Sequence, residues 1–113
     1  MSGITTHVLD TSRGCPAQGV PVRLEVQEGA AWRELGRGAT DADGRLRTLL
    51  PAGAPIAAGT YRITFDTAAY FKVCGVEGFY PEVTIPFIVK DAAAHYHVPL
   101  LISPYGYSTY RGS

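Results

Sequence analysis

Two histidines near the end of the sequence stand two residues apart. His95 and His97 are separated by Tyr96 in the segment His95-Tyr96-His97-Val98-Pro99-Leu100-Leu101. Because side chains two apart on a strand point to the same face, a strand here would put both imidazoles on one side, with Tyr96 and Val98 in the core. Imidazole exchanges protons near neutral pH and also binds metal ions. The pair therefore predicts either proton transfer or metal ligation.

Metal ligation is the less favoured of the two, because the rest of a ligand set is missing. The sequence contains no His-Glu-x-x-His motif, no cysteine cluster and no carboxylate spaced alongside the two histidines. Cys15 and Cys74 lie far apart and form no Cys-x-x-Cys pattern. Two reduced thiols are favoured over a disulfide between them, since no export signal is visible. We expect no metal and no cofactor.

Two further segments carry residues able to act on a proton or an anion. His7 stands in Thr5-Thr6-His7-Val8-Leu9-Asp10, and Arg45 directly follows the turn Asp41-Ala42-Asp43-Gly44, where the glycine is free to take a positive φ. A lone histidine near the start of a strand is usually structural or exposed. An arginine after a turn is usually a solvated surface charge. Neither residue alone predicts catalysis.

The sequence ends in a run that mixes aromatic and small polar residues, Tyr105-Gly106-Tyr107-Ser108-Thr109-Tyr110-Arg111-Gly112-Ser113. Chain ends usually consist of small polar or charged residues and fray, so three tyrosines within positions 105–110 are unusual. Tyrosine rings favour burial with their hydroxyls hydrogen-bonded. The run predicts a docked last strand with buried tyrosines, or an edge strand with aromatic packing.

The elements that must position these residues are mostly strands. Apolar and polar residues alternate with a period of two in four segments and more weakly in two others: Val20–Val26, Tyr61–Phe65, Val83–Val89 and Tyr96–Ile102, then Ile4–Leu9 and Trp32–Arg37. One helix is predicted over Ala68–Val73, capped by Asp66 or Thr67 and ended by Gly75. Many short strands and one brief helix indicate an all-β sandwich of two antiparallel sheets.

Length and composition fit one domain spanning residues 1–113. Hydrophobic residues make up 46% of the chain and charged residues 18%, which suits a packed core. Lysine plus arginine equal aspartate plus glutamate at 10 each, so no net charge would attract nucleic acid or an anionic membrane. No secretory signal and no membrane-length apolar stretch is visible, so we expect a cytoplasmic protein. A peroxisomal location stays open for a eukaryotic source, although no Ser-Lys-Leu ending occurs.

Together these segments resemble the 5-hydroxyisourate hydrolase family, also called transthyretin-related proteins. The most specific element is Tyr110-Arg111-Gly112-Ser113, and the other matching segments follow in the family's order: Thr6–Asp10, Thr40–Arg45, Ala69–Phe71, Phe79–Glu82 and His95–Leu101. The resemblance covers nearly the whole chain. It implies a transthyretin-like sandwich of two four-stranded antiparallel sheets with one short helix. It also implies a homotetramer, a dimer of dimers, with active sites where the dimers meet.

The resemblance further implies an enzyme, a hydroxyisourate hydrolase of urate degradation. Such an enzyme hydrolyses a cyclic amide-type bond of 5-hydroxyisourate and gives 2-oxo-4-hydroxy-4-carboxy-5-ureidoimidazoline. Carried over by motif, the catalytic residues would be His7, Arg45 and His97, and the substrate-binding residues would be His7, Arg45, Tyr110, Arg111, Gly112 and Ser113. A neutral histidine can take a proton from water near pH 7, and an arginine can stabilise the oxyanion. Which histidine is the base stays open. His95 would support His97 or face an interface.

Two other functions fit the same fold, because function depends on the site. A transthyretin-type carrier would bind a hydrophobic ligand in a central channel, whereas Arg45 and His97 suit a small polar heterocycle. A prealbumin-like structural module would share the segments Gly19–Val22, Thr40–Arg45 and Gly59–Tyr61. The ending of this chain favours the enzyme over both, and the absence of a visible signal favours it over the structural module.

Overall fold

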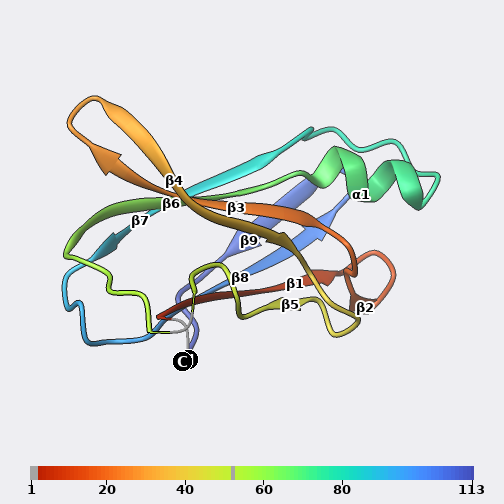
Figure 1. Ribbon diagram of the computed structural model, residues 1–113. Helices are drawn as coiled ribbons and strands as arrows, with labels where there is room; N and C mark the ends of the chain where they lie inside the picture. Colours follow the sequence, from red (N-terminus) through yellow and green to blue (C-terminus); the bar gives the residue numbers. More distant parts are fainter. Residues whose placement is uncertain (1–2, 52) are drawn as a thin grey trace.

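A computed structural model describes residues 3–51 and 53–113 of the chain. These residues form two β-sheets that face each other, with one short helix at one end of the sandwich (Figure 1). This arrangement confirms the predicted two-sheet architecture. Met1 and Ser2, where a signal segment would begin, and the predicted loop residue Ala52 lie outside the described residues.

The first sheet carries both histidine segments and has a parallel pair of strands in its middle. Its strands in spatial order are β2 (Cys15–Pro16), β1 (Ile4–Asp10), β8 (Tyr96–Ser103) and β9 (Gly106–Thr109), with β5 (Arg45–Leu46) also paired to β1. β1 and β8 run parallel, whereas the other pairs are antiparallel. The sheet thus departs from the expected four antiparallel strands in one pairing and in its fifth member. Period-two alternation fixes which face a residue takes but not the direction of its neighbour.

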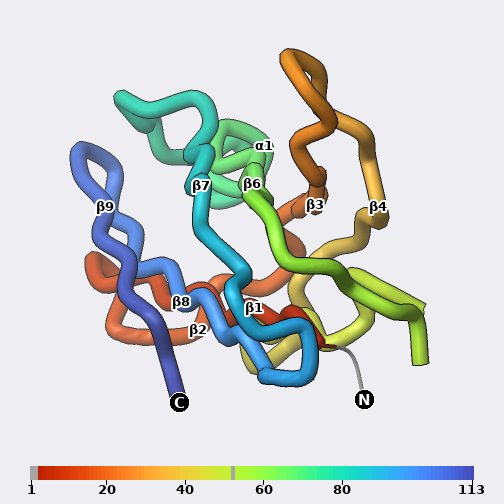
Figure 2. Tube along the Cα trace, turned by 90° about the vertical axis from the view of Figure 1, so that its left-hand side faces the viewer, coloured from red at the N-terminus to blue at the C-terminus, as the bar shows by residue number. Residues whose placement is uncertain are grey.

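The second sheet is antiparallel throughout, as predicted. Its strands in spatial order are β4 (Ala31–Ala39), β3 (Pro21–Glu28), β6 (Gly59–Phe65) and β7 (Val83–Val89). β3 and β4 form a hairpin whose turn contains Gly29 at a φ of 62°. Figure 2 shows the same two layers from the side. Both sheets end in open edge strands, at β9 in the first and at β7 in the second.

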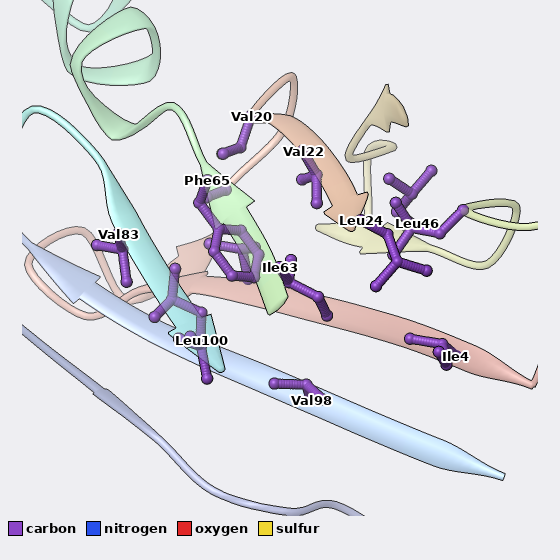
Figure 3. Close-up of a cluster of buried hydrophobic side chains, with 14 of the residues drawn as sticks. Ile4, Val20, Val22, Leu24, Leu46, Ile63, Phe65, Val83, Val98 and Leu100 are labelled. Carbon is purple, nitrogen blue, oxygen red and sulfur yellow. The ribbon is translucent and has the colours of Figure 1, made fainter. Parts of the chain in front are cut away.

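The hydrophobic core lies between the two sheets. Val98 and Leu100 of β8 and Ile63 and Phe65 of β6 point into the same space, with exposed fractions of 6% or less (Figure 3). Alternate residues on β8 must then point outward, because successive side chains on a strand face opposite ways. Packing of the core therefore places His97 on the outer face of the first sheet, as the sequence predicts.

Helix α1 (Thr67–Val73) begins and ends as predicted. The Asp66 carboxylate accepts the backbone N–H of Ala69, and Gly75 follows the helix at a φ of 70°. Tyr70 is buried and donates its hydroxyl to the Asp10 carboxylate at 2.8 Å, which fastens the helix to the end of β1. Within the described residues, no helix is long and apolar enough to cross a membrane.

The C-terminal run forms an edge strand and then returns to β8. β9 covers Gly106–Thr109, and an isolated bridge pairs Gly112 with His97. The predicted last strand is confirmed, but the burial of its tyrosines is not. Tyr105, Tyr107 and Tyr110 are 73%, 45% and 59% exposed. Tyr107 lies on β9, an edge strand with β8 as its neighbour, and packs edge-on against Tyr80, while Tyr105 and Tyr110 flank that strand.

Candidate active site

A pocket on the outer face of the first sheet brings together three of the seven predicted site residues, Arg45, His97 and Ser113. Its volume is about 200 Å³, and it is lined by Thr5, Thr6, Arg45, Arg47, His95, His97 and Ser113. The strand register explains the gathering, since Thr5 lies opposite His97 and His7 lies opposite Arg45. Residues paired across neighbouring strands point to the same side of a sheet. β1 therefore brings the histidine of β8 and the arginine of β5 onto one surface.

Arg45 is positioned by the turn that precedes it. The Asp41 carboxylate accepts the backbone N–H groups of Asp43 and Arg45, and these bonds hold the pKa of Asp41 below its ordinary value, the Arg45 bond most strongly. Gly44 has a φ of 76°, and a Cβ there would stand 2.3 Å from the carbonyl oxygen of Val8. Only glycine lets the turn approach β1 this closely. The close approach sets Arg45 beside His7.

His7 lies on the same outer face but is not among the residues that line the pocket. Its Nε2 lies 3.0 Å from the carbonyl oxygen of Asp43, a residue in the turn that precedes Arg45. A carbonyl oxygen can only accept, so Nε2 must carry the hydrogen. A neutral His7 then has its lone pair on Nδ1. The half-buried ring is thus fixed in orientation next to Arg45.

His97 is held from two sides. The hydroxyl of Thr5 lies 2.8 Å from Nδ1 of the ring. The backbone N–H of Gly112 donates to the carbonyl oxygen of His97 at 2.8 Å, and a Cβ on Gly112 would stand only 2.6 Å from ring atom Cδ2. The imidazole is therefore clamped between β1 and the end of the chain.

The surroundings of His97 favour its neutral form. Burial lowers its pKa below the ordinary value of 6.5, and the charge of Arg45 lowers it further, followed by smaller contributions from His7, His95 and Arg47. An imidazole that is neutral at pH 7 can accept a proton from water. Beside it, Arg45 supplies a fixed positive charge that suits a developing oxyanion. The pocket thus contains an imidazole able to act as a base and a guanidinium able to stabilise an anion.

The four residues at the end of the chain divide between two places. Ser113 lines the pocket and Gly112 touches the ring of His97. Arg111 stacks over the ring of Tyr96, 4.5 Å from its centroid, and reaches the carbonyl oxygen of His95. Tyr110 instead lines a second, mostly apolar groove of about 270 Å³ between β7 and β8, with Ile85, Phe87, Ile88, Tyr96, Val98, Thr109 and Arg111. Within one chain, Tyr110 is therefore not a lining residue of the histidine pocket.

Sequence reasoning missed Thr5 and Arg47. Both were within reach of the period-two rule, since Thr5 stands two residues before His7 and Arg47 two residues after Arg45. The sequence does not show which residues of other strands lie next to Thr5 and Arg47, because the pairing of β1 with β8 and β5 joins segments that are far apart in the sequence. Across residues 3–51 and 53–113, no group of three or more His, Cys, Asp or Glu side chains is arranged to hold a metal ion.

Comparisons with known proteins show the family and the fold of the chain. A family model described as the HIUase/Transthyretin family matches residues 4–112. A Caulobacter vibrioides protein named 5-hydroxyisourate hydrolase is 49% identical over 117 residues, covering 100% of both chains. The solved structure of Klebsiella pneumoniae 5-hydroxyisourate hydrolase is 42% identical, with a TM-score of 0.86 over 100% of both chains. Sea bream transthyretin in complex with thyroxine is 30% identical, with a TM-score of 0.88 over 97% of this chain and 94% of that one.

Proposed function

Since the chain belongs to the HIUase/Transthyretin family, we propose that it is a hydrolase that opens the ring of 5-hydroxyisourate in urate degradation, acting as one domain over residues 1–113. The observation that carries the proposal is the placement of His97, with its lowered pKa, beside Arg45 in one pocket. A carrier of hydrophobic ligands would favour an apolar lining, whereas two arginines and two histidines line this pocket.

The chemistry begins with water, which is a poor nucleophile until it loses a proton. His97 takes that proton, because burial and the charge of Arg45 keep its imidazole neutral at pH 7. The activated water attacks the carbonyl carbon of the cyclic amide-type bond. The carbonyl oxygen gains negative charge, and the guanidinium of Arg45 stabilises it. The imidazole of His97 is held by Thr5 and lies against Gly112 before substrate binds, so the base needs little reorganisation in the transition state.

The ring nitrogen must gain a proton as its bond to the carbonyl carbon breaks. The imidazolium formed at His97 returns one, and His7 shares in this transfer from its position opposite Arg45. The product is 2-oxo-4-hydroxy-4-carboxy-5-ureidoimidazoline. No covalent intermediate is required, since a water molecule is the nucleophile.

Substrate binding uses the end of the chain and a second copy of it. Ser113 lines the pocket from the same chain, Gly112 lies against the ring of His97, and Arg111 reaches the carbonyl oxygen of His95. Tyr110 lies in the apolar groove near the exposed edge of the sandwich, where a second copy would meet it. We propose a homotetramer, a dimer of dimers, in which neighbouring chains close the open pocket over the substrate and bring Tyr110 to it.

The test is an assay in which urate oxidase generates 5-hydroxyisourate from urate in the cuvette. This protein is then added, and the ultraviolet decay of the intermediate is followed. We expect decay well above the spontaneous rate, and a loss of roughly 100-fold or more in His97→Asn and in Arg45→Ala. Arg37→Ala is the matched control, because Arg37 is exposed on β4 in the other sheet and pairs with Glu34.

Two results would count against the proposal. Decay at the spontaneous rate with folded wild-type protein would reject the hydrolase and direct the search to ligands of the pocket. A near-wild-type rate in His97→Asn would remove that histidine from the mechanism and leave His7 as the candidate base.

A further inference from the structure

The hydroxyl of Thr5 lies between two imidazole rings. Its Oγ1 stands 2.8 Å from Nδ1 of His97 and 3.0 Å from Nε2 of His95. Thr5 is 6% exposed and sits in β1 opposite His97, and its branched side chain has few rotamers on a strand. The oxygen is therefore fixed at a point that both rings reach from β8 and the residue before it.

A hydroxyl has one hydrogen to donate and lone pairs that accept, and this limits the protonation of the two rings. If Thr5 donates to His97, then Nδ1 of His97 is the lone-pair nitrogen and Nε2 carries the hydrogen. If Thr5 donates to His95, then His97 donates from Nδ1 and its Nε2 is the lone-pair nitrogen. The direction of this one hydroxyl decides which nitrogen of His97 can act as a base.

The position of Thr5 favours donation toward His95. Thr5 occupies Nδ1 of His97, so Nε2 is the nitrogen left to meet water, and a base needs its lone pair there. Nδ1 then carries the hydrogen, which Thr5 accepts, and the hydrogen of Thr5 is left for Nε2 of His95. His95 is exposed to solvent whereas His97 is half-buried in the pocket with Arg45, so a charge that leaves His97 during the reaction is better solvated on His95. We propose that Thr5 is a positioning residue that accepts the Nδ1 hydrogen of His97 and donates its own to His95, so that Nε2 of His97 is left as the base and His95 is the outer end of a proton relay.

The relay balances without any further reactant. When Nε2 of His97 gains a proton from water, the Nδ1 hydrogen moves to the Thr5 oxygen while the Thr5 hydrogen moves to Nε2 of His95. His97 is then neutral with its hydrogen on Nε2, the Thr5 hydroxyl is restored, and His95 carries the positive charge. The reverse shifts return the charge to His97 when the leaving nitrogen needs a proton. This inference rests on the proposed hydrolase function, but the tautomer of His97 is measured without the reaction.

The first test reads the tautomer directly, in the ligand-free protein. Nitrogen–proton correlation spectra of isotope-labelled histidine distinguish the Nδ1–H form from the Nε2–H form of His97. We expect Nδ1–H in the wild type and in Thr5→Ser, which keeps the hydroxyl, and a population of Nε2–H in Thr5→Val, which lacks it. Wild-type His97 in the Nε2–H form, or an unchanged tautomer in Thr5→Val, would overturn the proposal.

The second test reads the consequence in the urate-coupled assay. Thr5→Val should lower kcat about 10- to 100-fold with little change in KM, as expected when a partner that orients a functional imidazole is lost. Thr5→Ser should restore most of the rate. Thr64→Val is the matched control, because Thr64 is also buried and hydrogen-bonded, to Thr84, but lies in the other sheet. A kcat loss in Thr64→Val equal to that in Thr5→Val would make the effect merely structural.

The two tests fail separately. If the protein does not accelerate the decay of 5-hydroxyisourate but the tautomer depends on Thr5, the hydrolase function is wrong and the coupling of the two histidines stands. If the wild type is an active hydrolase and Thr5→Val changes neither tautomer nor kcat, the coupling is wrong and the hydrolase stands.

Discussion

Arg45 affects two different groups of the site at once. In the proposed mechanism its guanidinium stabilises negative charge on a substrate oxygen, and the same charge lowers the pKa of His97, after burial the second contribution to that shift. The two effects support each other, because a base must be neutral when substrate arrives and the oxyanion forms immediately after the base acts. A lysine would offer a charge but not the planar set of donors.

The titration of His97 is the prediction that belongs to this residue. We expect its pKa below 6.5 in the wild type and raised in Arg45→Ala, though still below 6.5, because burial is the larger cause and remains. The chemical shift of the ring proton, followed against pH in ligand-free protein, measures both values. Arg37→Ala, in the other sheet, should leave the titration unchanged. A wild-type pKa at or above 6.5 would contradict the role of burial and of Arg45.

The lowered pKa of His97 also makes the stability of the fold depend on pH. As the pH falls below 6.5, the unfolded chain takes up a proton at His97 while the folded chain resists it, so the free energy of unfolding decreases. The loss is complete once the pH lies below the folded-state pKa. Denaturant unfolding should therefore show a smaller acid-side loss in His97→Asn than in the wild type.

At the scale of elements, the return of the chain end to β8 is what holds the ring of His97. Gly112→Ala would place a Cβ 2.6 Å from ring atom Cδ2, so the ring or the chain end must shift. Because displacement of a catalytic group by about 1 Å costs up to roughly 100-fold in rate, we expect a loss of 10- to 100-fold with little change in Tm. The matched control is Gly106→Ala, where the nearest atom is Ser103 Oγ at an ordinary 3.6 Å. A wild-type rate in Gly112→Ala would show that the contact is not needed.

The sequence predicts those parts of the fold and of the site that depend on residues near one another in the chain. The strands at residues 21–28, 59–65, 83–89 and 96–103 follow from alternation, and the helix follows from Asp66 and Gly75 at its ends. The parallel pairing of β1 with β8 does not, since it joins segments about ninety residues apart and no hairpin fixes its direction. The same limit applies to the site. That His95 and His97 share a face can be predicted from their spacing, whereas the position of Thr5 between them depends on the pairing of β1 with β8.

The position of Tyr110 is the clearest case of information missing from one chain. Its sequence context groups it with Arg111, Gly112 and Ser113, yet Tyr110 lies in the groove beside β7, whereas Gly112 lies against the ring of His97. The segment Tyr110–Ser113 thus contributes to two surfaces, the histidine pocket and the apolar groove. The prediction that Tyr110 contacts substrate stays a prediction, and its outcome depends on how copies of the chain assemble.

At the scale of the whole molecule, the edge of the sandwich formed by β7 and β9 exposes apolar and aromatic side chains to solvent. Ile88 on β7 is 62% exposed, and Tyr110 and Tyr107 on the neighbouring side are 59% and 45% exposed. An apolar groove runs between these edges, bordered by Ile85 and Phe87. Apolar groups and unpaired strand edges gathered at one place favour contact with another chain. The expected homotetramer would use this edge, and burial there would also cover the tyrosines that one chain leaves exposed.

Ile88→Lys tests that assembly. A lysine at this position would bring a charge into the contact, and loss of one buried isoleucine side chain costs about 1.5–3 kcal/mol, so association should weaken roughly 10-fold or more. Sedimentation velocity against concentration should show the tetramer dissociating to dimers or single chains, and the specific activity should fall with it, since we propose that neighbouring chains complete each pocket. Val73→Lys is the matched control, since Val73 is 89% exposed at the end of α1, away from that edge. Unchanged mass in Ile88→Lys would place the contact between chains elsewhere, and unchanged activity in a dissociated variant would mean that one chain forms a complete site.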